Sequence, residues 1–439
     1  MPAPSSDARP HHARYAWYVV AILSLASVSG WVDRGILGTL LPSIKKDFAL
    51  SDTQASLLQA LPFGLFFAVL GLPIARLADR SSRRNIIAGG AAVWSVFSML
   101  SAWTWSFMSL MVMRIGVGAG EATLSAPSVS LIADYFPRDR LSRAMSIFSL
   151  GIFLGSGIGY YIGGLVFTLS SSGRLPGLGT LHPWQATFIA IGVPGLIVAL
   201  LLLTVREPAR RNVDQAGRYT PLSVLVKYVA DNRRTYLAHG VGFGFSALVN
   251  FALAFWIPTF FARAHGWDEG AAARTMGVLT MTIGVAGVLS GGWLGDWLAR
   301  RGRTDAPILV GIVGAIGMVI AAPAFSLMPT GRSAVIALAV VNFFAAFPWG
   351  AASAAAAEMA PTALRAQSAA VYFFVLTIFS GTIGPLVVGL FNDHVFGPAG
   401  VAKSLAVVTA GGTALAAIFL AAGLGSYRRT LIYREGWIE

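Results

Sequence analysis

The stretch MVMRIGVGAGEATLSAPSVSLIADYF, residues 111–136, places Arg114 and Glu121 inside a segment that is otherwise typical of a membrane-spanning helix. A charge at the centre of a bilayer costs roughly 2.5–3.5 kcal/mol on insertion scales, so two charges in one span are not expected to face lipid. The two residues are about two helical turns apart, which puts both side chains on one face, about 10 Å apart along the axis. That face must contact protein or a water-filled cavity.

The composition of the chain indicates an integral membrane protein. Of its 439 residues, 56% are hydrophobic and only 12% are charged, and the mean hydropathy is +0.69. Soluble domains contain about 25% charged residues, and this chain cannot bury its apolar side chains in one water-soluble core. The absence of cysteine excludes disulfides and thiolate metal sites. The net charge of +13 is assigned to loops at the membrane surface and not to nucleic-acid binding.

Twelve apolar stretches each approach the ~20 residues that a helix needs to cross a bilayer. They must be helices, because an open sheet would leave backbone groups unpaired in lipid. We therefore predict an all-α membrane protein of twelve transmembrane helices, with one six-helix half over 17–205 and another over 233–426. The predicted spans are 17–44, 53–77, 85–103, 106–134, 140–168, 185–205, 233–262, 271–296, 306–325, 333–357, 365–391 and 402–426.

The distribution of Lys and Arg predicts the orientation of the chain. With both termini in the cytoplasm, the tails 1–16 and 427–439, the central loop 206–232 and the other inner connections hold most of the basic residues. The outer connections hold only Lys45, Lys46, Arg174, Arg263, Arg274, Arg332 and Lys403. Compact loops and short tails favour a bacterial inner membrane. The KYVADNRR end of the central loop is predicted to be a solvated basic linker, with an interfacial helix as the alternative.

A short motif occurs once in each half. ARLADRSSRR (75–84) follows the second span, and GWLGDWLARRG (292–302) follows the eighth. Both contain a small residue, an Asp four residues later and then clustered Arg residues. This placement indicates two related halves.

With these features the chain resembles the major facilitator superfamily, through its twelve spans, its basic central loop and the motif in both halves. The resemblance implies a transporter built from two six-helix halves that is monomeric by default. It also implies a cytoplasmic latch that forms in the outward-open state, from Asp79, Arg80, Arg83, Arg84 and Asp296. The alternative for Arg83 and Arg84 is plain positive-inside topology.

The fifth span, GIFLGSGIGYYIGG, has a glycine at every fourth position from Gly151 to Gly163. Small residues at this spacing let two helices approach closely. The run also resembles the antiporter motif of the superfamily, although Tyr160 stands in the place of its usual Pro. Close helix packing is the prediction, and exchange transport is the alternative.

A second charged pair, Asp33-Arg34, lies inside the first span, and we predict that it meets Arg114 and Glu121. Burial and a neighbouring Arg act on a carboxylate in opposite directions, which suits a group that loads and releases protons. Asp33 and Glu121 are therefore candidate proton carriers, with Arg114 as the partner that competes with the proton. Arg34 or Arg114 is a candidate site for a substrate anion. The alternative is a permanent ion pair that braces two helices.

In this superfamily spans 1, 4, 7 and 10 line the central cavity, and those of the C-terminal half carry almost no charge here. The candidate substrate-binding residues of this half are Asn250, Asn342 and Tyr372, among aromatic runs such as NFFAAFPWG and VYFFVLTIF. A cavity that is charged on one wall and aromatic on the other suits an amphiphile with an anionic or zwitterionic head group. The alternative is that these Phe-rich spans face lipid.

A closer resemblance covers residues 33–164. The Asp33-Arg34 pair, RIGVGAGEA in the fourth span and the following PSVSLIADYFPRDRLSRAMSIFSLGIFLGSGIGYYIGG are similar to the Spinster branch of the superfamily. Animal members export lysophospholipids or sphingosine-1-phosphate, and bacterial members resemble proton-linked relatives. The resemblance implies that Asp33 is the coupling Asp and that Arg114 and Glu121 are the functional residues of the fourth span.

These observations predict a proton-coupled secondary transporter of a lysophospholipid or similar amphiphile that works by alternating access. The expected partners are the lipid substrate and the bilayer, with protons as the coupling ion and no cofactor, metal or nucleic acid. An organic-anion or drug transporter with Arg114 as the anion site is the second candidate, and a non-transporting receptor or scaffold is the third. An enzyme is not expected, because the sequence has no metal-ligand cluster and no Ser/His/Asp arrangement at the membrane face.

Overall fold

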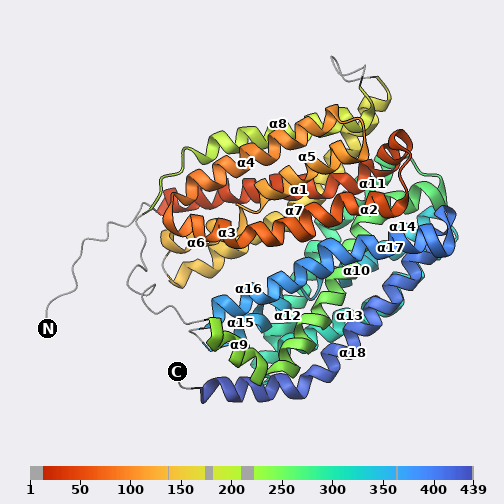
Figure 1. The fold of residues 1–439 in the computed structure, drawn as a ribbon. Helices are drawn as coiled ribbons and strands as arrows, with labels where there is room; N and C mark the ends of the chain where they lie inside the picture. Colours follow the sequence, from red (N-terminus) through yellow and green to blue (C-terminus); the bar gives the residue numbers. More distant parts are fainter. Residues whose placement is uncertain (1–12, 137, 174–180, 209–221, 362–363, 438–439) are drawn as a thin grey trace.

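The computed structural model describes residues 13–136, 138–173, 181–208, 222–361 and 364–437, and every regular element within these ranges is a helix. Twelve helical stretches in the described residues are long and apolar enough to cross a membrane, which confirms the predicted fold class. They form two bundles, coloured red to yellow-green and green to blue in Figure 1. Helix α1 begins and helix α18 ends at the same end of the molecule, called here the terminal end; the opposite end is called the far end.

The N-terminal half is built from helices whose starts are fixed by local capping. Ser51 and Ser106 each accept a hydrogen bond from the backbone N–H three residues later, which satisfies a free donor at the start of α2 and of α5. The elements of this half are α1 (Ala13–Phe48), α2 (Asp52–Ala60), the π-helix η1 (Leu61–Phe66), α3 (Phe67–Arg80), α4 (Arg83–Leu100), the short η2 (Ser101–Trp103), α5 (Phe107–Glu121), α6 (Ser125–Tyr135), α7 (Arg138–Ser171) and α8 (Pro183–Leu202).

The fourth span, predicted as one helix over 106–134, is two helices. Helix α5 ends at Glu121, and α6 begins at Ser125. The break has a local cause, because Pro127 has no N–H to donate to the carbonyl group of Thr123. Glu121 is therefore the last residue of its helix, in the interior of the bundle.

The C-terminal half repeats this plan with its own interruptions. Its tenth span is broken at Pro348 in the same way, between α14 and α15. The elements are α9 (Leu222–Asp231), α10 (Arg233–His265), α11 (Glu269–Leu279), the π-helix η3 (Thr280–Gly284), α12 (Val285–Arg300), α13 (Ala306–Ser326), α14 (Gly331–Ala346), α15 (Trp349–Glu358), α16 (Arg365–Thr377), the π-helices η5 (Ile378–Ile383) and η6 (Asn392–Phe396) flanking α17 (Gly384–Phe391), the short η7 (Pro398–Gly400) and α18 (Val401–Glu435).

The KYVADNRR end of the central loop, residues 227–234, differs from the prediction of a solvated linker, which was wrong, because these residues end one helix and begin the next. Residues 222–231 form helix α9, and it packs on the C-terminal half. Tyr228 is buried there and donates a hydrogen bond to the backbone O of Met359 (2.8 Å). An apolar face containing Leu225 and Tyr228 gives the segment a surface to bury, which a purely basic linker would lack.

The glycines of α7 let two other helices approach it closely, as predicted. A Cβ atom added at Gly155 would lie 2.7 Å from the backbone O of Val28 in α1, and one at Gly159 would lie 2.8 Å from the Cα of Val32. On another side, a Cβ at Gly157 would lie 3.0 Å from the backbone O of Gly277 in α11. Helix α7 therefore contacts its own half and the other half through backbone surfaces.

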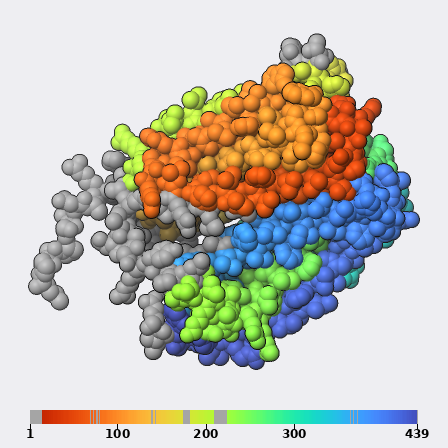
Figure 2. Space-filling view, in the orientation of Figure 1, coloured from red at the N-terminus to blue at the C-terminus, as the bar shows by residue number. Residues whose placement is uncertain are grey.

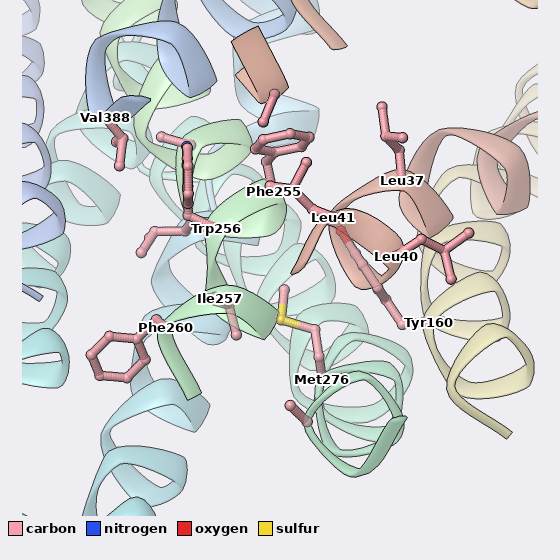
Figure 3. Packing of buried hydrophobic residues seen from close by; sticks show 14 of the residues in the cluster. Leu37, Leu40, Leu41, Tyr160, Phe255, Trp256, Ile257, Phe260, Met276 and Val388 are labelled. Carbon is pink, nitrogen blue, oxygen red and sulfur yellow. The ribbon is translucent and has the colours of Figure 1, made fainter. Parts of the chain in front are cut away.

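The two halves meet along a seam that is closed at the far end. Figure 2 shows the red helices of the N-terminal half against the blue helices of the C-terminal half there. Inside the seam, Leu37, Leu40 and Leu41 of α1 pack with aromatic and aliphatic side chains of α10 (Figure 3). Tyr160 donates a hydrogen bond across the seam to the backbone O of Ala254 (3.0 Å). Toward the terminal end, α3 packs on α6 within one half, and α15 packs on α12 and α16 within the other.

Candidate functional site

The four charged residues of the first and fourth spans meet as two ion pairs between α1 and α5. Arg114 donates from Nη1 to Asp33 Oδ1 (2.7 Å) and from Nη2 to the backbone O of Asp33 (3.4 Å). Arg34 donates from Nε to Glu121 Oε2. The predicted meeting of the two charged pairs is therefore confirmed. The structure also specifies the partners, because Arg34 and not Arg114 contacts Glu121.

The cluster is almost closed to solvent. The exposed fraction is 0% for Arg114, 2% for Glu121 and 3% for Asp33, whereas the side chain of Arg34 remains 18% exposed. Buried charges at this depth are tolerated only because each has an opposite charge beside it. Arg34 is therefore the member through which the cluster reaches open space.

Aromatic rings flank both guanidinium groups. The guanidinium carbon of Arg34 lies 4.5 Å from the ring centroid of Phe67 and 4.9 Å from that of Trp31. The guanidinium carbon of Arg114 lies 5.1 Å from the centroid of Phe63, also within range of a cation–π interaction. Oε1 of Glu121 is buried and has no hydrogen-bond partner. An unpartnered carboxylate oxygen in this position is able to receive a proton.

A cavity of about 100 Å³ lies between the two halves, beside Arg34. Among the described residues that line it, Arg34 carries the only charge, and no carboxylate reaches it. Its polar side chains are amides, hydroxyls and that one guanidinium group. They are Arg34 (α1), Gln59 (α2), Ser156 and Tyr160 (α7), Asn250 (α10), Thr280 (η3) and Asn342 (α14).

One wall of the cavity is aromatic and comes from both halves. Trp31 lies 6.3 Å from Phe251 across the seam, measured between ring centroids, and Phe251 lies 6.4 Å from Trp349. Phe153 of α7 packs edge-on against Trp349 at 6.2 Å, again between halves. Apolar surface therefore borders the guanidinium group of Arg34, an arrangement that suits an anionic or zwitterionic group attached to an apolar body.

Comparison with known proteins decides the family. The model of the Major Facilitator Superfamily matches residues 23–385. Protein spinster homolog 1 of Homo sapiens is 30% identical over 402 residues, which cover 86% of this chain and 73% of the human protein. The chain is a Spinster-type member of the major facilitator superfamily. It is therefore a transporter and not an enzyme, as the sequence predicts.

Two other similarities extend over nearly all of the Spinster-type chain. An MFS-type efflux pump of Mycolicibacterium smegmatis is 27% identical over 427 residues, which are 96% of this chain and 96% of the pump. A solved bacterial homologue of the human lysosomal transporter Spinster, in an inward-facing and unoccupied conformation, superposes with a TM-score of 0.79 at 25% identity. That superposition covers 96% of this chain and 98% of the solved one.

The substrate-binding residues predicted from sequence are not all at the cavity of this Spinster-type transporter. Arg34, Asn250 and Asn342 line it. Arg114 is fully buried behind it and does not line it. Tyr372 lies away from it, with its ring 4.9 Å from that of His239. The sequence analysis missed other cavity-lining residues, among them Trp31, Gln59 and Trp349. Of these three, only Gln59 could have been found from the sequence, because it is a polar residue inside an apolar span.

The predicted latch residues of the transporter lie at the terminal end. Arg83 donates from Nη1 to Asp134 (2.5 Å) and from Nε to Glu207 Oε1 (2.8 Å), and Glu207 Oε2 accepts from the backbone N–H of Arg84 (2.9 Å). Asp134 belongs to the N-terminal half, and Glu207 lies just after that half, at the start of the central loop. Arg80 and Asp296 are exposed. The structure describes the backbone of Asp79 but not its side chain.

We expect acid to weaken this network through Glu207. Partial burial opposes its ionisation, but hydrogen bonds from the Arg84 N–H and the Arg83 guanidinium prevail and hold the pKa of Glu207 below its ordinary value. A lowered folded-state pKa stabilises the protein above the unfolded-state pKa, and this stability is lost as pH falls through the folded value. Glu207→Gln should therefore cost about 1 kcal/mol at neutral pH and flatten the acid-side loss of thermal stability. Thermal unfolding measured from pH 7 to 3 checks this, and an unchanged pH profile would contradict it.

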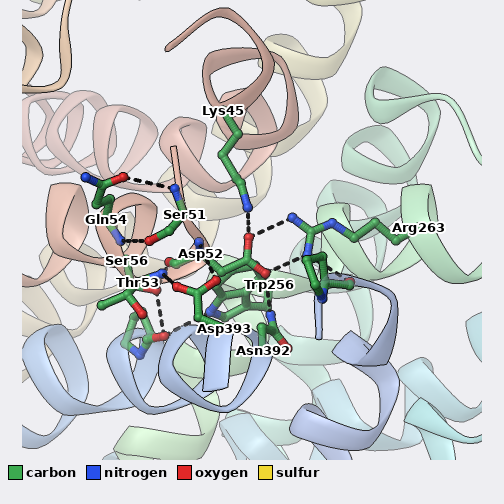
Figure 4. Close-up of polar contacts among 12 residues, drawn as sticks. Lys45, Ser51, Asp52, Thr53, Gln54, Ser56, Trp256, Arg263, Asn392 and Asp393 are labelled. Carbon is green, nitrogen blue, oxygen red and sulfur yellow. Dashed lines mark hydrogen bonds and ion pairs between the residues drawn. The ribbon is translucent and has the colours of Figure 1, made fainter. Parts of the chain in front are cut away.

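At the far end, a buried carboxylate connects the two halves. Asp52 is fully buried and accepts hydrogen bonds from Arg263 Nη1 (2.6 Å) and Nη2 (2.8 Å) of the other half (Figure 4). Lys45 forms an ion pair with the same carboxylate, and Asn392 donates to it (2.8 Å). Asp393 accepts hydrogen bonds from the backbone N–H of Asp52 (3.0 Å), at the start of α2. We call Lys45, Asp52, Arg263, Asn392 and Asp393 the far-end lock.

Proposed function

We propose that this transporter carries a lysophospholipid or a similar anionic or zwitterionic amphiphile and couples its movement to protons. The observation that carries the proposal is the position of Arg34, which contacts Glu121 with Nε and lines the cavity. One side chain therefore joins the candidate proton site to the candidate substrate site.

In this proposal Arg34 couples the two sites by competition. The Nη groups of Arg34 bind the anionic head group of the substrate, and this contact weakens the hold of Arg34 on Glu121. Glu121 Oε1, which has no partner, then takes a proton. Protonation neutralises the buried carboxyl group, so Glu121 no longer needs Arg34 as a counter-charge. Asp33 is the second candidate carrier, and Arg114 holds it in position by a hydrogen bond of 2.7 Å.

We also propose that the terminal end is cytoplasmic, in a bacterial inner membrane, and that this conformation is inward-facing. The bias of Lys and Arg toward that end supports the orientation. The far-end lock and the Tyr160–Ala254 hydrogen bond hold the halves together at the other end. In this proposal the head group occupies the cavity beside Arg34, and the acyl chain lies against the apolar side chains that border it.

The test is flux of a labelled lysophospholipid into proteoliposomes under an imposed pH gradient. We expect wild-type flux to follow the gradient, and Asp33→Asn and Glu121→Gln each to reduce gradient-driven flux at least tenfold, because a neutral amide cannot carry the proton. Asp231→Asn, a change to an exposed acid at the end of α9, is the matched control and should transport normally.

Two results would contradict the proposal. Gradient-driven flux that survives in both Asp33→Asn and Glu121→Gln would remove the proton-carrier role from these residues. Lysolipid flux that ignores the gradient in the wild type would make the protein a facilitated-diffusion carrier.

A second candidate is an organic-anion or drug transporter. It is favoured by the single cation among the described cavity-lining residues and by the similarity to the mycobacterial MFS-type efflux pump over 96% of the chain. In the same vesicles, competition by short hydrophilic anions without any effect of lysolipids would select this candidate.

A further inference from the structure

Gln59 has an amide that the protein leaves unused. The residue lies in the last turn of α2, lines the cavity and is only 5% exposed. Its Oε1 is buried and unpartnered, and its amide makes no hydrogen bond with any described residue. A buried amide oxygen without a donor is unfavourable, and native proteins keep few of them. Such a group in a ligand cavity indicates a partner that is not part of the chain.

Asn250 offers a second free amide, from the other half of the molecule. It comes from α10 of the C-terminal half, lines the same cavity and makes no hydrogen bond with the described residues. By contrast, the third amide, Asn342, donates to the backbone O of Leu338 (3.1 Å) and accepts from Thr280 (3.4 Å). The two free amides therefore belong to different halves, so a ligand that binds both contacts both halves.

The charge of the cavity restricts what such a ligand can be. Arg34 is the only charged side chain among the described residues that line it, so a substrate anion has a partner and a substrate ammonium has no carboxylate. An amide oxygen needs a donor, and an amide NH₂ group needs an acceptor. A hydroxyl group is both donor and acceptor, and it matches the two free amides without needing a counter-charge.

We propose that Gln59 and Asn250 form a hydroxyl-binding subsite beside Arg34, and that they make the transporter select head groups of the glycerol phosphate type over those that end in a quaternary ammonium. Arg34 takes the phosphate, and the two amides take the hydroxyls. This inference rests on the proposed function and specifies its substrate class. The competing outcome is a quaternary ammonium held against Trp31 and Trp349 by cation–π contacts.

The natural absence of cysteine provides the assay. Ser156→Cys introduces one thiol at the cavity, and its rate of alkylation reports occupancy. The probes are glycerol 3-phosphate and phosphocholine, followed by lysophosphatidylglycerol and lysophosphatidylcholine of equal chain length. We expect the glycerol compound of each pair to protect the thiol at a roughly tenfold lower concentration than the choline compound. A tenfold difference in affinity is about what one well-made hydrogen bond contributes. Gln59→Met, similar in shape but without the amide, should abolish the preference.

The controls separate this inference from the proposed function. Leu65→Met, at a half-exposed position in η1 that does not line the cavity, should keep the wild-type preference. An equal effect of the glycerol and choline probes on the wild type would overturn the subsite, and so would a preference that persists in Gln59→Met. A preference among the water-soluble probes without any lysolipid transport would support the subsite and remove the lysolipid function.

Discussion

Replacing Arg114 with glutamine is expected to abolish gradient-driven transport and to destabilise the protein by about 3–5 kcal/mol. Arg114 is fully buried, and its Nη1 lies 2.7 Å from Asp33 Oδ1. Its removal leaves Asp33, which is 3% exposed, as a charge with no counter-charge in the interior. Most of the lost stability therefore comes from the unpaired Asp33 carboxylate, and less of it comes from the broken hydrogen bond between Arg114 and Asp33.

The double variant Arg114→Gln with Asp33→Asn separates stability from transport. It removes both charges, so we expect most of the lost stability to return while gradient-driven flux stays absent. Thermal unfolding followed by tryptophan fluorescence, together with flux in proteoliposomes, measures the two properties. A double variant as unstable as Arg114→Gln alone would show that the pair does not account for the loss.

Asp52→Ala is expected to open the far end of the molecule. The change removes the carboxylate that Arg263 and Lys45 share and leaves two cations facing each other in the seam. A loss of about 3 kcal/mol from the closed state shifts the conformational equilibrium by roughly a hundredfold. Helix α2 should remain folded, because Ser51 still caps it and Asp393 still accepts from the backbone N–H at position 52.

Spin labels at the far end measure this opening in a chain with no native cysteine. Trp105→Cys and Leu327→Cys place one label on each half, at positions that are 81% and 62% exposed. We expect the label distance to lengthen in Asp52→Ala and to stay at its wild-type value in Asp231→Asn. A distance distribution that Asp52→Ala leaves unchanged would mean that the other contacts between the halves keep this end closed without the Asp52 carboxylate.

The charge cluster could be predicted from the sequence because a charge in an apolar span has few tolerable positions. The pairing within the cluster could not. Asp33 and Arg34 are consecutive, so their side chains point about 100° apart around α1, and only the rotation of that helix decides which one meets Arg114. The sequence analysis assigned Arg114 as the competitor of the proton at both acids, whereas Arg34 contacts Glu121.

The cavity lining was harder to predict for a related reason. In a soluble protein apolar residues mark the inside, but in a membrane protein they face both the interior and the lipid. Phe251 lines the cavity, whereas Phe373, in a similar aromatic run, is 51% exposed. Gln59 is one polar residue in an apolar span. The sequence does not show how the helices pack around it, so the missing partner of its amide could not be predicted.

The break in the fourth span lies between two distant groups of charges. Helix α6 begins just after Glu121 and carries Asp134 at its other end, where Arg83 binds. Its 11 residues form a rod about 16 Å long. A rotation of about 10° at the break would move the distal end of that rod by about 3 Å, comparable to the length of a hydrogen bond. The break therefore lies between two buried acids of the fourth span, Glu121 at the end of α5 and Asp134 near the end of α6, so a change in the angle between these helices changes the separation of the two charges.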